Sequence, residues 1–310
     1  MNNVVVYVSS VANYQRHPRK VECLESFAKG VFSTGHYIHV QYKMEYKPSK
    51  LAVILGWATT NTGGPNILLR RKIIEEQARL GGHTMCIDAS CWKYVDNHGT
   101  YLRYSLGGPF YDSAEYANKN STDQKWNEIS DRLGISLDSP SSDPNGHILI
   151  CMQRDGGFAM KSLNPITWMQ NKIQEIRKYT DRKIIIRPHP GAYKMQDFRS
   201  YFSSSDIALR QNAFVIDPLT VTLTDNLNGA HSAVFFNSSS SVAAVCKGIP
   251  VFVDDVSCVS WNVANKDISQ IETPQTFERT QWLYDLAAAH WSDDDARSGR
   301  IYQKFLPYLT

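Results

Sequence analysis

The chain has 310 residues and a formal net charge of +3, with 42% hydrophobic and 20% charged residues. These values exclude a disordered or fibrous chain, and they lack the strong basic bias of a protein that binds nucleic acid non-specifically. The length suffices for two domains of ordinary size, each with its own core.

The cysteines and the first residues of the chain indicate the cellular compartment of the protein. No CxxC spacing occurs, and several cysteines lie in apolar runs, which is typical of small buried hydrophobes in a reducing environment. The six positions are Cys23, Cys86, Cys91, Cys151, Cys246 and Cys258. No apolar stretch approaches the roughly 20 residues that span a bilayer, and "VVVYV" follows the start without the features of a signal peptide. We expect a cytoplasmic protein, in the host cytoplasm if a phage encodes it.

Short β-branched runs alternate with helical stretches, which is the pattern of parallel strands covered by helices on both faces. The predicted strands are residues 4–8, 51–55, 83–88, 147–152, 183–187, 232–236 and 250–253. The predicted helices are residues 19–30, 66–80, 123–133, 165–180, 239–247 and 276–290. The sequence therefore predicts an α/β fold.

One stretch divides this alternation in two. Residues 136–146, "SLDSPSSDPNG", are rich in serine, aspartate and proline and continue neither a helix nor a strand. The strand–helix pattern starts afresh at His147. We predict two Rossmann-like domains, residues 1–140 and residues 147–310 with C-terminal helices, that face each other across a cleft.

Polar residues follow three predicted strands of the second half. Gln153 and Arg154, before Gly156-Gly157, come after strand 147–152; "RPHP" ends strand 183–187; and Asn237 with four serines follows strand 232–236. Ligands of open α/β sheets bind outside the carboxyl ends of the strands. These residues are therefore the first candidates for a binding site.

The serine run "NSSSSVAAVCKG" predicts a short helix with serines at its N-cap, Lys247 in its last turn and Gly248 as C-cap. Free N–H groups and the helix dipole favour an anion there, and the hydroxyls add donors. The alternative is that one serine caps the helix and the others fill space.

The stretch "RPHP" offers two further groups for an anion. Arg187 carries a planar fork that suits phosphate oxygens, and His189 is fixed between two prolines. The alternative is an ordinary surface turn after an internal strand. Taken with Arg154 and the serines, the pattern favours a phosphate pocket.

These motifs carry a resemblance. "RPHP", the serines that open a helix and "AAVCKGIPVFV" are similar to the donor-binding half of GT-B glycosyltransferases, particularly capsule-type and sialyltransferase-like enzymes with HP and SS motifs. Residues 147–292 also resemble a glycosyltransferase-like family common in tailed phages. The resemblance implies that residues 147–310 bind a nucleotide sugar and residues 1–140 the acceptor. It implies that His189, Ser238, Ser239 and Ser240 contact the phosphates of the donor, with Arg187 and Arg154 in support. Gln153 and Asn237 are donor-binding candidates by their strand-end position.

Several other chemistries lack their motifs. "SSVANYQ" replaces a GxGxxG after the first strand, and no GxxxxGK[ST] occurs. Aspartates with DxD spacing occur in "SDDDAR" (292–297), which we expect in a solvated helical region, and no cluster has metal-ligand spacing. We therefore expect transfer without a metal and without a cofactor other than the nucleotide-sugar donor.

Inverting transfer needs a base for the acceptor hydroxyl. Asp88 ends a predicted strand and is our candidate, although it equally suits a cap of the next turn. Asp112 and His17 are rivals for the role, the first also readable as a helix cap and the second as a loop residue. Arg103 either orients the acceptor or is a strand-edge charge.

The leading hypothesis is an inverting glycosyltransferase. For its acceptor we favour hydroxymethylated pyrimidine in phage DNA, because the phage resemblance joins basic runs at 14–20 and 68–72. A base extruded from the duplex needs an aromatic pocket, for which Tyr14, Trp57, Trp92 and Tyr101 are candidates. A capsular or other glycan is the alternative acceptor, and a non-catalytic nucleotide-sugar or nucleic-acid binding protein is the alternative of another class.

Overall fold

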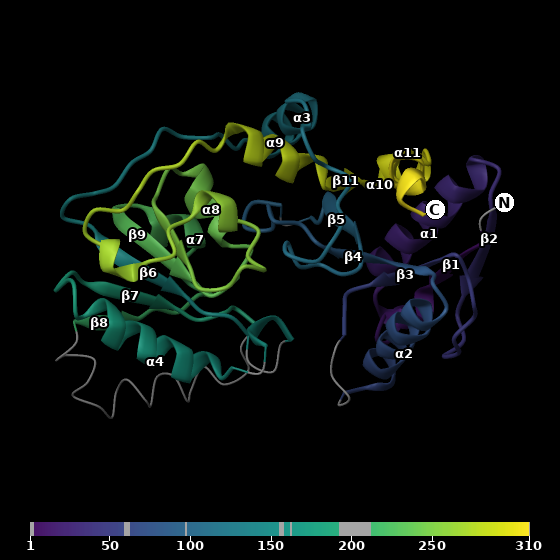
Figure 1. Ribbon diagram of the computed structural model, residues 1–310, viewed down its shortest axis with the longest axis horizontal. Helices are drawn as coiled ribbons and strands as arrows, with labels where there is room; N and C mark the ends of the chain where they lie inside the picture. Colours follow the sequence, from purple (N-terminus) through teal and green to yellow (C-terminus); the bar gives the residue numbers. More distant parts are fainter. Residues whose placement is uncertain are drawn as a thin grey trace. The chain divides into compact units, whose positions relative to one another are not determined.

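The computed structural model describes residues 3–58, 63–96, 98–154, 158–161, 163–191 and 212–309. The chain forms two compact units (Figure 1). Unit 1 comprises Met1–Trp126 and Tyr284–Thr310, and unit 2 comprises Asn127–Leu283. Each unit is built on its own β-sheet, and together they confirm the predicted α/β fold of two Rossmann-like domains.

The sheet of unit 1 has the strand order β11-β5-β4-β3-β1-β2. Its strands are β1 (Asn3–Tyr7), β2 (Tyr37–Gln41), β3 (Leu51–Leu55), β4 (His83–Ala89), β5 (Tyr101–Leu106) and β11 (His290–Ser292). The first four are parallel to one another, whereas β5 and β11 complete one side of the sheet with antiparallel pairing. The carboxyl ends of β1 to β4 therefore share one edge.

Helices cover both faces of this sheet. Alternate residues of β1 point to opposite faces, so neighbouring residues contact different helices. The helices of unit 1 include α1 (Pro18–Ser33), α2 (Pro65–Arg79), α10 (Asp293–Arg297) and α11 (Arg300–Phe305), with short 3-10 turns η1 (Val8–Ser10), η2 (Tyr14–Arg16) and η6 (Leu306–Tyr308). Val4 belongs to one core cluster with Phe27 of α1. Its neighbour Val5 belongs to another cluster with Ile73 of α2, so the two helices lie on opposite faces (Figure 1).

The sheet of unit 2 is entirely parallel and has the order β10-β9-β6-β7-β8. Its strands are β6 (His147–Cys151), β7 (Ile184–Arg187), β8 (Ala213–Val215), β9 (Ala230–Phe235) and β10 (Val251–Val253). Strands β6, β7, β9 and β10 are mostly buried, as expected of strands covered on both faces, whereas Phe214 of the edge strand β8 is 41% exposed.

Helix α4 covers one face of this sheet, where Met169 and Ile173 pack against Ile148 and Ile184. The other helices and turns of unit 2 include α7 (Leu223–Leu227), α8 (Ser241–Cys246), η3 (Phe158–Met160), η4 (Trp261–Val263) and η5 (Ile268–Gln270), and α4 itself spans Pro165–Ile176. Helices α3 (Gln124–Leu133) and α9 (Thr280–Ala288) carry the chain between the units.

The expected assignment of residues 147–310 to one domain is wrong for the last segment. Residues 284–310 fold with unit 1, where β11 pairs with β5 and covers what would otherwise be an open sheet edge. Ile301 and Phe305 are buried in the same cluster as Val4. This long-range pairing has no local sequence signal.

The structure also bears on the expectations about the cysteines and about membrane-spanning segments. All six cysteines are buried, as predicted, and none forms a disulfide. No helix within the described ranges is both long and apolar enough to cross a lipid bilayer.

Candidate active site

The carboxyl edge of the unit 2 sheet brings together most of the predicted donor-binding residues. Strands β9, β6 and β7 are neighbours in this parallel sheet. Asn237 follows β9, Gln153 and Arg154 follow β6, and His189 follows β7. Sheet topology thus gathers groups that lie up to 84 positions apart in sequence, as the joined pair Gln153 and Asn237 does.

Asn237 is the hub of this edge. Its side chain is buried, and its Oδ1 accepts a hydrogen bond from Gln153 Nε2. Its Nδ2 donates to Ala159 O and Ser257 Oγ, both at 2.8 Å. Because both ends of the amide are engaged, Asn237 is fixed in one orientation and links loops from three strand ends.

The sequence analysis missed the outer part of the same network. Ser257 donates to one oxygen of Asp255, and the other oxygen lies 2.8 Å from Lys161 Nζ. Burial alone would raise the pKa of Asp255, but the bonds from Lys161 and Ser257 hold it below its usual value. Asp255 comes two residues after β10. A search for polar residues after the predicted strand 250–253, as was done for the other three predicted strands of this half, would have found it.

The serine run differs in detail from the predicted capped helix. Helix α8 begins at Ser241, and Ser240 is its N-cap residue but makes no capping bond. The first amides of the turn, at Ser241 and Val242, donate to Ser238 O and Ser239 O. The N–H groups expected to be free are therefore used inside the turn.

Hydroxyl groups remain as the candidate anion donors of this run. Ser238 Oγ and Ser240 Oγ lie 2.7 Å apart, and Ser239 is partly exposed. Ser241 instead faces the interior, where its Oγ lies 2.7 Å from Ser260 Oγ. The predicted end of the helix is confirmed, since Gly248 has a φ of 75° directly after the C-cap Lys247.

The guanidinium of Arg187 makes hydrogen bonds within unit 2. Nη1 donates to Val221 O at 2.6 Å and to Asn226 Oδ1 at 2.7 Å, and Nη2 lies 3.3 Å from Pro218 O. The side chain is buried, and this burial lowers the pKa of Arg187. In this structure Arg187 braces the segment from Pro218 to Asn226 beside the edge.

His189 and Arg154 are exposed. The Nδ1 atom of His189 accepts a bond from the Gly191 N–H at 2.9 Å, so the neutral ring carries its proton on Nε2. Gly156-Gly157, the loop glycines noted after Arg154, lie outside the described residues.

Two predicted acceptor residues meet at the carboxyl end of β4 in unit 1. Asp88 and Arg103 are directly paired across β4 and β5, and Asp88 Oδ2 lies 2.7 Å from Arg103 Nη2. The Arg103 side chain is buried, whereas that of Asp88 is 36% exposed. Burial alone would lower the pKa of Arg103, but Tyr116, Cys91 and Asp88 raise it well above its ordinary value. Arg103 is therefore a fixed cation that orients the carboxylate.

His290 lies behind this pair, on the strand that covers β5, and was expected at the end of a helix. Its Cα is paired with that of Arg103. Nδ1 donates to Leu286 O at 2.7 Å, and Nε2 accepts from Cys91 N at 3.0 Å. Burial, with the nearby charge of Arg103, lowers the pKa of His290 to about 3. The ring is thus a neutral structural link and not an exposed base.

The rival bases are placed differently. His17 is exposed at the start of α1, after the carboxyl end of β1, and therefore lies on the same sheet edge as Asp88. Asp112 is in an exposed turn after β5 and not at a helix start. Neither makes a polar contact with Asp88 within the described ranges.

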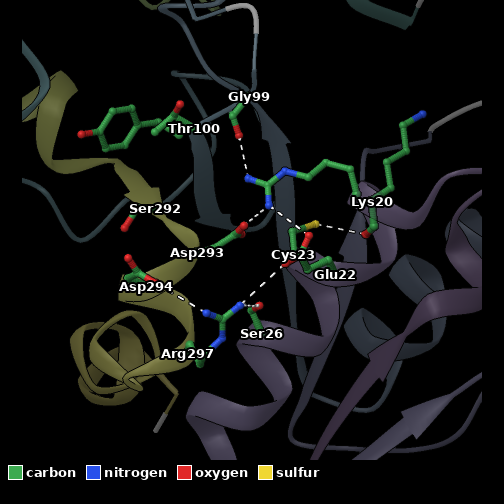
Figure 2. A network of polar contacts seen from close by, with 12 residues as sticks. Lys20, Glu22, Cys23, Ser26, Gly99, Thr100, Ser292, Asp293, Asp294 and Arg297 are labelled. Atoms are coloured by element: carbon green, nitrogen blue, oxygen red, sulfur yellow. Dashed lines mark hydrogen bonds and ion pairs between the residues drawn. The ribbon is translucent and has the colours of Figure 1, made fainter. Parts of the chain in front are cut away.

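One cation of each predicted basic run is paired with a carboxylate. Arg19 pairs with Asp293 and Glu22 and donates to Gly99 O at 3.1 Å (Figure 2). Arg71 pairs with Glu75 at 2.6 Å. Arg16, Lys20 and Lys72 are exposed, so both runs keep positive charge at the surface.

The "SDDDAR" segment is not the solvated helix that was expected. Asp295 is buried, and its carboxylate lies 2.8 Å from Lys125 Nζ and 3.1 Å from Arg300 Nη2. Among the described residues, no group of three or more His, Cys, Asp and Glu side chains is placed to hold a metal ion.

Comparisons with known proteins reveal similar structures but no similar sequences. No known protein family and no curated protein matches the sequence. The structure is similar to a beta Kdo 2,7 transferase of KpsC from Thermosulfurimonas dismutans, with a TM-score of 0.53 and 11% identity over 98% of this chain and 100% of that chain. It is also similar to the beta Kdo 2,4 transferase of KpsC from the same organism, with a TM-score of 0.53 and 13% identity over 93% of this chain and 89% of that chain. Both similarities extend through the two units and concern the fold.

Proposed function

We propose that the protein is a glycosyltransferase that uses a nucleotide sugar. The observation that carries the proposal is the polar edge of the unit 2 sheet, where Gln153, Asn237 and the serine hydroxyls of 238–240 gather with exposed His189 and Arg154. Neutral donors and cations at the carboxyl ends of parallel strands suit the diphosphate or phosphate of a nucleotide. The names of the two similar structures support the same class, since both are sugar transferases.

In this proposal His189, Arg154 and the hydroxyls of Ser238, Ser239 and Ser240 contact the phosphates. Gln153 and Asn237 shape the pocket floor, and Arg187 holds the neighbouring segment in place. Positive charge and oriented donors stabilise the leaving phosphate as the glycosidic bond breaks. The proposed transfer uses no divalent metal.

For the acceptor step we propose inversion with Asp88 as the base. One carboxylate oxygen is held by Arg103, and the other has no partner within the described part of the chain. That second oxygen takes the proton of the acceptor hydroxyl while the hydroxyl oxygen attacks the anomeric carbon. Asp112 and His17 remain the rivals that a failure of Asp88 would promote.

Of the two acceptor classes we propose a glycan and not a pyrimidine in DNA. Trp92 and Tyr101 are completely buried and therefore do not stack on an extruded base. One cation in each basic run that motivated the DNA hypothesis, Arg19 or Arg71, is paired with an acidic residue. A glycan hydroxyl makes no comparable demand for phosphate contacts.

The test is a transfer assay read by mass spectrometry. The purified protein is incubated with UDP-, GDP- and CMP-sugars and with two acceptor sets, bacterial surface oligosaccharides and DNA containing hydroxymethylated pyrimidine. A mass increase of one sugar on an oligosaccharide is the expected result. A product on DNA alone would restore the DNA acceptor, and nucleotide-sugar binding without any product would favour the non-catalytic alternative.

A further inference from the structure

The loops after β1 and β2 of unit 1 carry an aromatic pair, half-buried Tyr14 and exposed Tyr42, that the proposed chemistry does not use. The rings of Tyr14 and Tyr42 have centroids 6.0 Å apart and planes inclined by 58°. Tyr42 is 45% exposed, and Met44, two residues further on, is also 45% exposed. We name Tyr14, Tyr42 and Met44 the aromatic platform.

The platform lies on the acceptor edge of unit 1. Strands β1 and β2 are parallel neighbours, so the residues that follow them emerge at the same side of the sheet. Strand β4 is parallel to them, and it ends beside Asp88 at that same side. An acceptor that reaches Asp88 therefore approaches the edge on which the platform stands.

Hydrogen bonds hold the platform in a fixed form. Tyr42 Oη donates to Glu25 at 2.7 Å. This bond raises the pKa of Tyr42 to about 12, so its hydroxyl keeps its proton at neutral pH. Asn66 Nδ2 donates to Ser9 O at 2.7 Å and to Val11 O at 3.0 Å, which fixes the loop that leads to Tyr14. A preorganised pair loses little entropy when a ligand binds.

We propose that the aromatic platform binds a sugar ring of the acceptor glycan, an inference that rests on the proposed function. A pyranose has an apolar C–H face for an aromatic ring and a rim of hydroxyls for a group such as the Glu25 carboxylate. The two ring planes are inclined by 58°, so they form no parallel slot into which a flat base could insert. Two exposed side chains, Tyr42 and Met44, beside half-buried Tyr14 are also too few for a protein partner, whose interfaces bury about 800 Å² per side.

The test compares three variants in the transfer assay with the acceptor that it identifies. Tyr42→Ala removes the ring, and we expect the acceptor KM to rise about tenfold while the donor KM stays within twofold. Tyr42→Phe keeps the ring and should retain an acceptor KM within about threefold of wild type. Tyr37→Ala is the matched control, because Tyr37 is 58% exposed and begins β2, whereas Tyr42 follows the other end of that strand.

A second readout is independent of turnover. Saturation-transfer NMR with cellohexaose, chitohexaose and maltohexaose should show enhanced sugar C–H signals that Tyr42→Ala abolishes and Tyr37→Ala leaves intact. An unchanged acceptor KM in Tyr42→Ala, with no oligosaccharide signal that depends on Tyr42, overturns the proposal. A Tyr42-dependent signal for single-stranded DNA and none for the oligosaccharides overturns it as well. Absence of transfer with a Tyr42-dependent sugar signal rejects the enzymatic function and keeps the platform.

Discussion

The carboxyl edges of the two sheets hold their polar side chains in different ways. In unit 2 the groups form a continuous chain from Gln153 through Asn237 and Ser257 to Asp255 and Lys161. In unit 1 Asp88 and Arg103 form an ion pair at the edge, and neutral His290 lies opposite Arg103 on β11. A connected network suits tight binding of one polar ligand, whereas an isolated, oriented carboxylate suits a proton transfer.

The largest effect expected from this contrast is on turnover. Asp88→Asn keeps the shape of the side chain and removes its basicity, so kcat should fall by roughly 10² to 10⁴, the span of a general base. Steady-state kinetics at saturating donor measures it, with Asp112→Asn as the matched control. Wild-type turnover in a folded Asp88→Asn protein removes Asp88 from the mechanism.

The second effect separates bracing from binding on the unit 2 edge. Arg187→Ala leaves the acceptors Val221 O and Asn226 Oδ1 without their donor, so the free energy of unfolding should fall by about 2–4 kcal/mol. Urea unfolding measures the loss. Arg154→Ala, an exposed counterpart, should leave stability unchanged and weaken nucleotide binding. If Arg187→Ala keeps full stability and loses nucleotide affinity, Arg187 is a phosphate ligand instead.

The third effect is the pH dependence of unit 1. The pKa of His290 is lowered from 6.5 to about 3 by burial, so its neutral form stabilises the fold fully above pH 6.5 and that contribution is lost as the pH falls toward 3. At pH 5 the loss from this group is about 2 kcal/mol. Urea unfolding between pH 7 and pH 5 measures it. His290→Gln, which can keep one donor and one acceptor, should flatten that dependence, and an identical slope in the variant would contradict the assignment.

The smallest expected effect is that of metal removal. Because the proposed stabilisation of the leaving phosphate comes from cations and hydroxyls, turnover in excess EDTA should match that of the untreated protein. Initial rates with and without EDTA compare the two. A complete loss that manganese or magnesium restores would show that the transfer depends on a metal.

The sequence was informative where structure is local. The buried strands β1, β3, β6 and β9 are β-branched or apolar runs, and their period and length reveal them directly. Strands β2, β5, β8 and β11 were missed. The β11 strand has three residues and exists because it covers β5, which is a pairing over some 190 positions that no local pattern encodes.

The candidate site divides in the same way. Strand-end position correctly gathered Gln153 with Asn237, because parallel topology places such residues on one edge. It did not reveal that Arg187 turns to Val221 O, since a guanidinium can serve a phosphate or a carbonyl equally well. The contribution of Lys161 was also hidden, because it depends on where Asp255 lies in space.

The most direct test of the central claim is calorimetric titration of the protein with UDP, GDP and CMP, which probes the unit 2 edge without any acceptor. We expect one of these nucleotides to bind the wild-type protein and His189→Ala to weaken that binding about tenfold, the loss of one charge-assisted phosphate contact. His17→Ala, an exposed histidine of unit 1, should leave the affinity unchanged. Equal affinity in wild type and His189→Ala, or binding of none of the three nucleotides, would contradict the assignment of the nucleotide-sugar site.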